Sequence, residues 1–262
     1  MLWLRKTFSN IVSTIKDFLT QLSRNAVPAY SAQAAFYILI SLFPLIMLTM
    51  TVIHYLPIAQ DEIQDMLFSF MPWETRDFMK NIMTDIYSSA SGTLISITAV
   101  TTLWAASSGV FALMNGINSV YKVPEQRGFV RLRAMSVIYT LFFILFLVGT
   151  MGILVFGDSF ARAVVGIIIL TVFSLVVYLL IPNRKGKIRN EIVGAIVSSI
   201  GWVVFSYLFS FYIDNFSNYS RFYGSMTAIV LLMLWLYFCM YIMLVGAQIN
   251  VFIQKTGDGS VD

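Results

Sequence analysis

The chain has 262 residues, of which 58% are hydrophobic and only 11% are charged, with a net charge of +4 at pH 7. Soluble domains carry about 25% charged residues, so this composition excludes an ordinary soluble protein and indicates an integral membrane protein. Cys239 is the only cysteine of the chain, which excludes an intrachain disulfide, and it lies inside an apolar run.

Residues 1–28 precede the first long apolar run and are predicted to be a cytoplasmic amphipathic segment. Apolar side chains recur there at spacings of three and four, while charged side chains mostly occupy the other side of a helix. Two interpretations stay open: the helix lies on the membrane surface, or it packs against cytoplasmic loops. The apolar positions are Leu4, Phe8, Ile11, Ile15, Phe18 and Leu22.

The first predicted span, residues 29–56, contains no Lys, Arg, Asp or Glu. As a helix it is longer than the roughly 30 Å of bilayer hydrocarbon. Pro44 has no backbone N–H and is expected to bend this helix. A polar stripe also follows one side of the span, and lipid cannot satisfy such a stripe. Its members are Tyr30, Gln33, Tyr37, Ser41 and Pro44.

Five further apolar runs follow an acidic segment, residues 57–92, which is predicted to form short helices outside the membrane. The second span has a small and polar face that includes Ser108 and Asn115, and the fifth has Gly194, Ser198 and Gly201 on one face, which favours close contact with another helix. The sequence therefore predicts an all-α polytopic membrane domain, residues 29–253, and a disordered tail, residues 254–262. The six predicted spans are residues 29–56, 93–121, 134–156, 163–181, 192–213 and 225–253.

The 17 Lys and Arg residues are divided unequally between the two sides that six spans define. Most fall in the N-terminal segment, the loop after the second span and the loop after the fourth span. The loop after the second span carries Lys122, Arg127, Arg131 and Arg133, whereas the opposite side has only Arg76, Lys80, Arg162 and Arg221. The positive-inside rule then places both termini in the cytoplasm. Topology and lipid headgroups explain these basic loops, so we expect no nucleic-acid partner.

Several segments together resemble the YihY/BrkB family of bacterial inner-membrane proteins. They are AAFYILISLFPLI in the first span, SSGVFALMNGINSVY in the second, IPNRKGKIRNEIVGA before the fifth, and FYGSMTAIVLLMLWLY followed by GAQIN in the sixth. The resemblance covers nearly the whole chain and implies a multi-pass protein of the bacterial plasma membrane. It implies little chemistry, because the family has no agreed activity, although it once carried the label ribonuclease BN.

The residues argue against a ribonuclease. The only histidine, His54, stands near the end of the first span, and no phosphate-cradling glycine loop occurs. A metal-dependent nuclease needs several His or carboxylate ligands around its ion. The side predicted to be cytoplasmic offers only scattered acids: Asp17, Glu125, Glu191, Asp258 and Asp262. We therefore predict no catalytic, cofactor or metal site and treat the protein as a non-enzyme.

The polar stripes suggest instead a cavity between the first, second and fifth spans, through which a small solute or a lipid moves. For any one residue, a hydrogen bond that holds the bundle together is the better explanation of its polarity, whereas the coherent stripes on three helices, taken together, favour a pathway. The alternative function is a membrane scaffold or envelope assembly factor, and the expected partners are membrane lipids. The predicted lining is Gln33, Tyr37, Ser41, Pro44, Ser108 and Asn115, and the predicted outer mouth is Asp214, Arg221, Tyr223 and Gly224.

Overall fold

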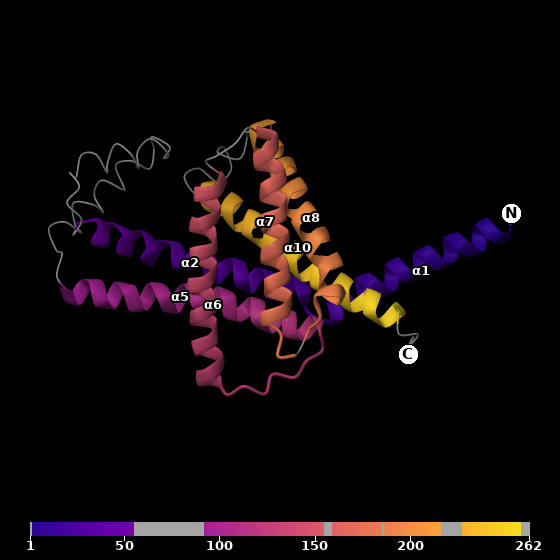
Figure 1. The fold of residues 1–262 in the computed structure, drawn as a ribbon, viewed down its shortest axis with the longest axis horizontal. Helices are drawn as coiled ribbons and strands as arrows, with labels where there is room; N and C mark the ends of the chain where they lie inside the picture. Colours follow the sequence, from indigo (N-terminus) through magenta and orange to yellow (C-terminus); the bar gives the residue numbers. More distant parts are fainter. Residues whose placement is uncertain (1, 55–91, 155–158, 185, 216–226, 258–262) are drawn as a thin grey trace.

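The computed structural model describes residues 2–54, 92–154, 159–184, 186–215 and 227–257. All regular structure within these ranges is helical, which confirms the all-α class (Figure 1). The helices are α1 (Leu2–Arg24), α2 (Val27–His54), α5 (Gly92–Val120), α6 (Phe129–Leu154), α7 (Ser159–Leu180), α8 (Ile188–Asn215) and α10 (Thr227–Gly257).

Several of these helices are long and apolar enough to cross a membrane. Four such stretches lie in α5, α6, α8 and α10: Val100–Val120, Phe129–Phe146, Ile188–Ile213 and Thr227–Lys255. Helices α2 and α7 carry shorter apolar stretches within the described residues, Val27–Leu42 and Val164–Leu180. The architecture is therefore that of a multi-pass helical membrane protein, and the count of six spans stays a prediction.

Helix α6 begins at Phe129, earlier than the predicted third span, residues 134–156. Its first helical bond runs from the Leu132 amide to the Gly128 carbonyl at 3.0 Å. No proline or glycine lies between Gly128 and the apolar run, so the helix includes the basic residues that precede this run. Arg131 and Arg133, which the sequence analysis assigned to a loop, therefore belong to α6.

Helices α2 and α5 pack against each other over much of their length, running in opposite directions (Figure 1). Two glycines of α5 allow this approach. A Cβ at Gly109 would lie 2.7 Å from Cγ1 of Ile38, and a Cβ at Gly116 would lie 2.9 Å from Cβ of Tyr30. These contacts set the register, in which Gly109 lies level with Ala34 and Ile38.

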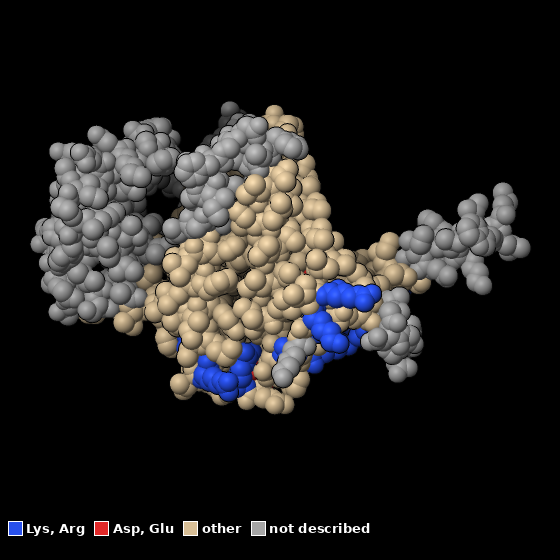
Figure 2. Space-filling model, in the orientation of Figure 1, with Lys and Arg blue, Asp and Glu red and all other residues tan. Residues whose placement is uncertain are grey.

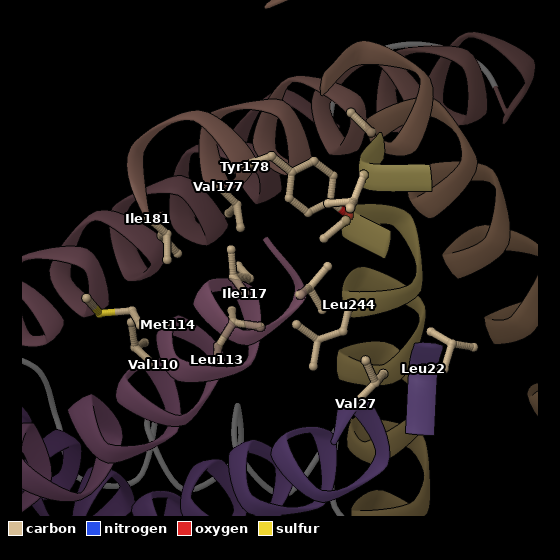
Figure 3. Close-up of a cluster of buried hydrophobic side chains, with 14 of the residues drawn as sticks. Leu22, Val27, Val110, Leu113, Met114, Ile117, Val177, Tyr178, Ile181 and Leu244 are labelled. Atoms are coloured by element: carbon tan, nitrogen blue, oxygen red, sulfur yellow. The ribbon is translucent and has the colours of Figure 1, made fainter. Parts of the chain in front are cut away.

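Helix α10 contacts α2, α5 and α8, while α7 packs on α8 and α6 packs on α5. The main apolar core lies where these helices meet (Figure 3). Figure 3 shows Tyr178 of α7, Ile117 of α5 and Leu244 of α10 converging on it, and each is fully buried. Val27 of α2 and Leu22 of α1 close the core from the N-terminal side.

The small residues of the fifth predicted span do contact a neighbouring helix. Gly194 and Ser198 of α8 lie against Gly246 of α10 so closely that no Cβ could be added at Gly194 or Gly246. Gly201 is less constrained, because its Cβ would lie 3.2 Å from Cγ2 of Ile242. The expectation of close backbone approach is confirmed, and α10 is the partner.

Helix α1 projects from the bundle, and its apolar face is divided. Phe18 and Leu22 pack onto the bundle, with the Phe18 ring edge-on to Phe252 at 5.7 Å between centroids. Val12, Ile15 and Leu19 are exposed on the same helix. Lys and Arg side chains gather on the lower part of the face in Figure 2, near the end of the bundle where α6 begins.

Candidate functional site

The six residues predicted to line a cavity differ in their surroundings. Ser41 and Ser108 are buried, Tyr37 and Asn115 are partly buried, and Gln33 is exposed. Pro44 lies within α2, which is described as a helix through that position, but its side chain lies outside the described residues. The predicted stripe of α2 is therefore not uniformly directed into the bundle.

The two buried hydroxyls bond to their own helices. Ser41 Oγ donates to the Ile38 carbonyl at 2.7 Å, and Ser108 Oγ donates to the Trp104 carbonyl at 2.9 Å. Such back-bonding is a common way for serine to be satisfied in an apolar helix. Each oxygen keeps acceptor capacity for another partner.

The register of α2 and α5 brings part of the stripe to one level. Gly109 lies against Ala34 and Ile38, so Tyr37 of α2 stands near the height of Ser108 on α5, and Ser41 lies about one turn further along α2. Helix α8, by contrast, packs mainly against α7 and α10. Because α10 and α6 border the α2–α5 pair, they replace α8 as the neighbours of this polar region.

The predicted outer mouth is not described. Asp214 belongs to α8, but its side chain lies outside the described residues, as do Arg221, Tyr223 and Gly224. These four residues remain a prediction.

Arg133 adds a charge that the sequence analysis did not assign to this region. Its guanidinium lies over the Trp104 ring, with 3.9 Å from Cζ to the ring centroid. Nη2 donates to the Trp104 carbonyl at 2.7 Å and to Ser108 Oγ at 2.9 Å. Tyr37 of α2 is close enough to interact electrostatically with the guanidinium. We call Arg133, Trp104, Ser108 and Tyr37 the guanidinium site. Because α6 starts at Phe129, Arg133 lies in its second turn. This position in the helix is the signal from which its place beside α5 could have been predicted.

A second polar group surrounds Glu191, in the first turn of α8. Its carboxylate is fully buried and pairs with Arg184 and with the Tyr121 hydroxyl. Asn250 Nδ2 donates to it at 3.0 Å, and Gln254 Nε2 lies 3.5 Å from its other oxygen. We call Glu191, Tyr121, Arg184, Asn250 and Gln254 the Glu191 cluster.

The Glu191 cluster connects the end of α5, the start of α8, the segment between α7 and α8, and α10. A buried charge is tolerated only when it is paired and hydrogen-bonded, and both oxygens of Glu191 have partners. The Arg184 guanidinium also stacks over the Tyr121 ring at 3.9 Å. From the sequence, Glu191 is only one of several scattered acids, because its partners are distant along the chain.

A second ion pair orders the loop after α5. Arg127 Nη2 lies 2.5 Å from Glu125 Oε2, and Asn118 Nδ2 donates to the same oxygen at 2.8 Å. The hydrogen bonds from Arg127 lower the pKa of the Glu125 carboxyl below its ordinary value, against the opposing effect of burial. Within the described residues, no group of three His, Cys, Asp or Glu side chains is placed to hold a metal ion.

Comparison with known proteins shows relatives along nearly the whole chain. The family model described as "Virulence factor BrkB" matches residues 18–261. The chain is 29% identical to the ribonuclease-like protein YfkH of Bacillus subtilis, covering 93% of this chain and 96% of that protein. It is 25% identical to a UPF0761 membrane protein of Alteromonas mediterranea, covering 93% and 90% respectively. No solved structure matches it significantly.

Proposed function

From the premise that the chain belongs to the BrkB family of membrane proteins, we propose that it moves a small polar solute or a lipid headgroup along the polar faces of α2 and α5 in the bacterial plasma membrane. Both termini are cytoplasmic in this proposal, because the basic residues are concentrated on that side. The observation that carries the proposal is the guanidinium site, where a charge meets the predicted polar stripe.

Arg133 places a positive charge within a helical membrane bundle. Ionisable groups in such positions are expensive to bury, so they usually serve a transported or bound species. Arg133 lies beside Ser108 at 2.9 Å and has no carboxylate partner among the described residues. Hydroxyl groups can replace water around a polar guest without adding further charge. Tyr37 and Ser108 are therefore suited to such a guest.

RNA cleavage is not part of this proposal. Asp17 is a single exposed acid on α1; of the other acids on the basic side with described side chains, Glu125 pairs with Arg127, and Glu191 is enclosed by Arg184 and Tyr121. These two paired carboxylates are already occupied by protein donors, which leaves them poorly suited to a catalytic metal. The term ribonuclease-like belongs to the name of the Bacillus relative.

A non-transporting scaffold is the second candidate, and two observations favour it. The Glu191 cluster ties four segments together, as a rigid framework requires. Leu19 of α1 is 57% exposed and lies beside exposed Val12 and Ile15, so α1 presents an apolar surface to a possible partner. The two functions differ in whether water reaches the polar region between the helices.

Cysteine accessibility tests this difference. Cys239 is first replaced by Ser, and Ser41→Cys, Ser108→Cys and Asn115→Cys are then made singly. Each variant is treated, in sealed vesicles of either orientation, with a membrane-impermeant thiol reagent. We expect labelling at positions 41 and 108. Exposed Thr20→Cys is the positive control, and Ala112→Cys, at a fully buried position of α5, is the negative control.

If positions 41, 108 and 115 all resist labelling from both sides while Thr20→Cys reacts, no aqueous path reaches the polar faces. The scaffold function then replaces transport. Melting temperatures of the variants must match that of the Cys239→Ser parent, so that lack of labelling reflects inaccessibility of a folded protein.

A further inference from the structure

Arg133 differs from the other partly buried arginines of the described chain. Arg127 is paired with Glu125, and Arg184 is paired with Glu191. Arg133 has no carboxylate within salt-bridge distance among the described residues. Its acceptors are the Trp104 carbonyl and the Ser108 hydroxyl, both neutral. The positive charge of Arg133 therefore has no neighbouring counter-charge, whereas those of Arg127 and Arg184 are each balanced by a carboxylate.

Around Arg133 there are more hydrogen-bond donors than acceptors. The Trp104 carbonyl accepts from Ser107 Oγ at 3.0 Å, Ser108 Oγ at 2.9 Å and Arg133 Nη2 at 2.7 Å. A carbonyl oxygen has two lone pairs, so three donors compete for it. No described residue accepts from Nη1, and Nε is buried without a hydrogen-bond partner. An acceptor-rich guest would relieve this excess.

The site is also reachable from the side of the bundle. Trp104 is 58% exposed, so the ring that supports the guanidinium faces the surroundings of the bundle. Cation–π stacking keeps the guanidinium plane fixed while leaving its edge free for hydrogen bonds. An interfacial arginine that merely reached for water would not need an aromatic support and a helix carbonyl to hold it.

We propose that Arg133, together with Ser108 and Tyr37, binds a phosphate group, carried either by a lipid headgroup or by a soluble phosphate ester. This assignment names the substrate class and rests on the proposed function. Phosphate offers several oxygen acceptors to the free guanidinium hydrogens, to the Tyr37 hydroxyl and to the Ser108 hydroxyl once it turns away from the crowded Trp104 carbonyl, whereas a neutral solute offers no counter-charge. Arginine also matches phosphate geometry better than lysine does.

The test compares Arg133→Gln with Arg131→Gln in the full-length protein. Both changes remove one positive charge from the start of α6, but Arg131 is exposed and, two residues before Arg133, lies on nearly the opposite face of the helix. Phosphatidylglycerol binding is measured by native mass spectrometry of detergent-purified protein, with a galactolipid that lacks phosphate as the neutral comparison. Glycerol 3-phosphate binding is measured in parallel by the change in tryptophan fluorescence, with Trp104→Phe to identify the signal of Trp104.

We expect Arg133→Gln to weaken phosphatidylglycerol binding about tenfold, the effect of losing one charge-assisted contact, and Arg131→Gln to change it less than about twofold. Galactolipid binding should be equal in all variants. If glycerol 3-phosphate also binds and the response disappears with Arg133→Gln, the phosphate can come from a soluble ester. If only the lipid responds, the phosphate belongs to a headgroup.

Equal phosphatidylglycerol binding by Arg133→Gln and Arg131→Gln overturns the proposal, and Arg133 is then an ordinary interfacial arginine. Arg133→Lys is a second variant, in case Arg133→Gln does not fold. It keeps the positive charge but loses the planar guanidinium that donates two parallel hydrogen bonds and stacks on Trp104. A folded Arg133→Lys variant with unchanged binding and an unchanged Trp104 signal likewise overturns the proposal.

The result can be separated from that of the cysteine experiment. Lost phosphate binding in Arg133→Gln, together with unlabelled cysteines at 41, 108 and 115, leaves a lipid-binding site on a protein that does not transport. Labelled cysteines with no dependence of binding on Arg133 leave an aqueous path whose guest is not a phosphate.

Discussion

Asn250 and Glu191 form a double contact that fastens α10 to the first turn of α8. Asn250 Nδ2 donates to the Glu191 carboxylate at 3.0 Å and to the Glu191 backbone carbonyl at 3.1 Å. Asn250 Oδ1 meanwhile accepts from the Gly194 amide at 2.6 Å, one turn further along α8. Both side chains are fully buried. This amide therefore orients a carboxylate that also holds Arg184 and Tyr121, and it links the close contact between α8 and α10 at Gly194 to a buried charge.

Removal of the Glu191 carboxylate is expected to destabilise the protein strongly. Glu191→Ala leaves Arg184 without its counter-ion and removes the carboxylate acceptor of Asn250, and breaking a buried ion pair costs about 3–5 kcal/mol. Glu191→Gln keeps the shape and should cost less. The measurement is the melting temperature of the detergent-purified protein. A Glu191→Ala variant that melts with the wild type would show that the Glu191 cluster does not contribute to stability.

A methyl group added at Gly246 should disrupt the α8–α10 contact. Its Cβ would overlap Ser198 Oγ and approach Tyr178, so Gly246→Ala is expected to cost about 1–3 kcal/mol by overpacking. Gly194→Leu should be at least as harmful, and Gly201→Leu milder. Gly128→Ala is the matched control, because nothing lies within 4 Å of its Cβ position. The folded yield in detergent is the readout, and equal yields for Gly246→Ala and Gly128→Ala would contradict the close contact.

Reporter fusions test the predicted topology. The unequal distribution of the 17 Lys and Arg residues predicts that both termini are cytoplasmic and that residues 57–92 lie outside. A cytoplasm-active reporter fused after Lys255 should be active, and a periplasm-active reporter at the same point should be silent. The reverse pattern would invert the topology, and opposite results for the two termini would mean an odd number of spans.

Helix α1 is expected to lie in the membrane interface through Val12, Ile15 and Leu19. In the Cys239→Ser background, a spin label at Leu19→Cys should be accessible to oxygen, which partitions into lipid. A label at Asp17→Cys, also exposed but on the polar side of the helix, should instead be accessible to a water-soluble nickel reagent. Equal accessibilities at the two positions in bilayers would favour the other interpretation, in which α1 contacts cytoplasmic loops.

The loop after α5 should lose stability in acid through Glu125. The pKa of this carboxyl is lowered in the folded state, so its contribution is fully present above the unfolded pKa and is lost as the pH falls through the folded pKa. Because the Glu125 side chain is 21% exposed, we expect at most about 1 kcal/mol. The difference in melting temperature between wild type and Glu125→Gln should be constant above about pH 5 and shrink below about pH 4. A difference that grew in acid would contradict the assignment.

Hydropathy and charge placement were sufficient to predict an all-α membrane protein, the approximate positions of its long apolar helices and the close approach at Gly194 and Ser198. These features depend on properties of single segments: apolar length, the period of a helix and small side chains on one face. The family resemblance also followed from local motifs, and the match over residues 18–261 confirms it.

The partners of each polar residue could not be predicted, because they are distant along the chain. Glu191 meets Tyr121 and Asn250 only once α5, α8 and α10 are packed together. Arg133 reaches Trp104 and Ser108 because α6 starts early and crosses α5. Likewise, α8 lies against α10 rather than beside α2, since Gly246 offers a backbone surface that no helical wheel of α8 alone reveals. Periodicity identifies the polar face of a helix, but the neighbour of that face depends on how all the helices pack.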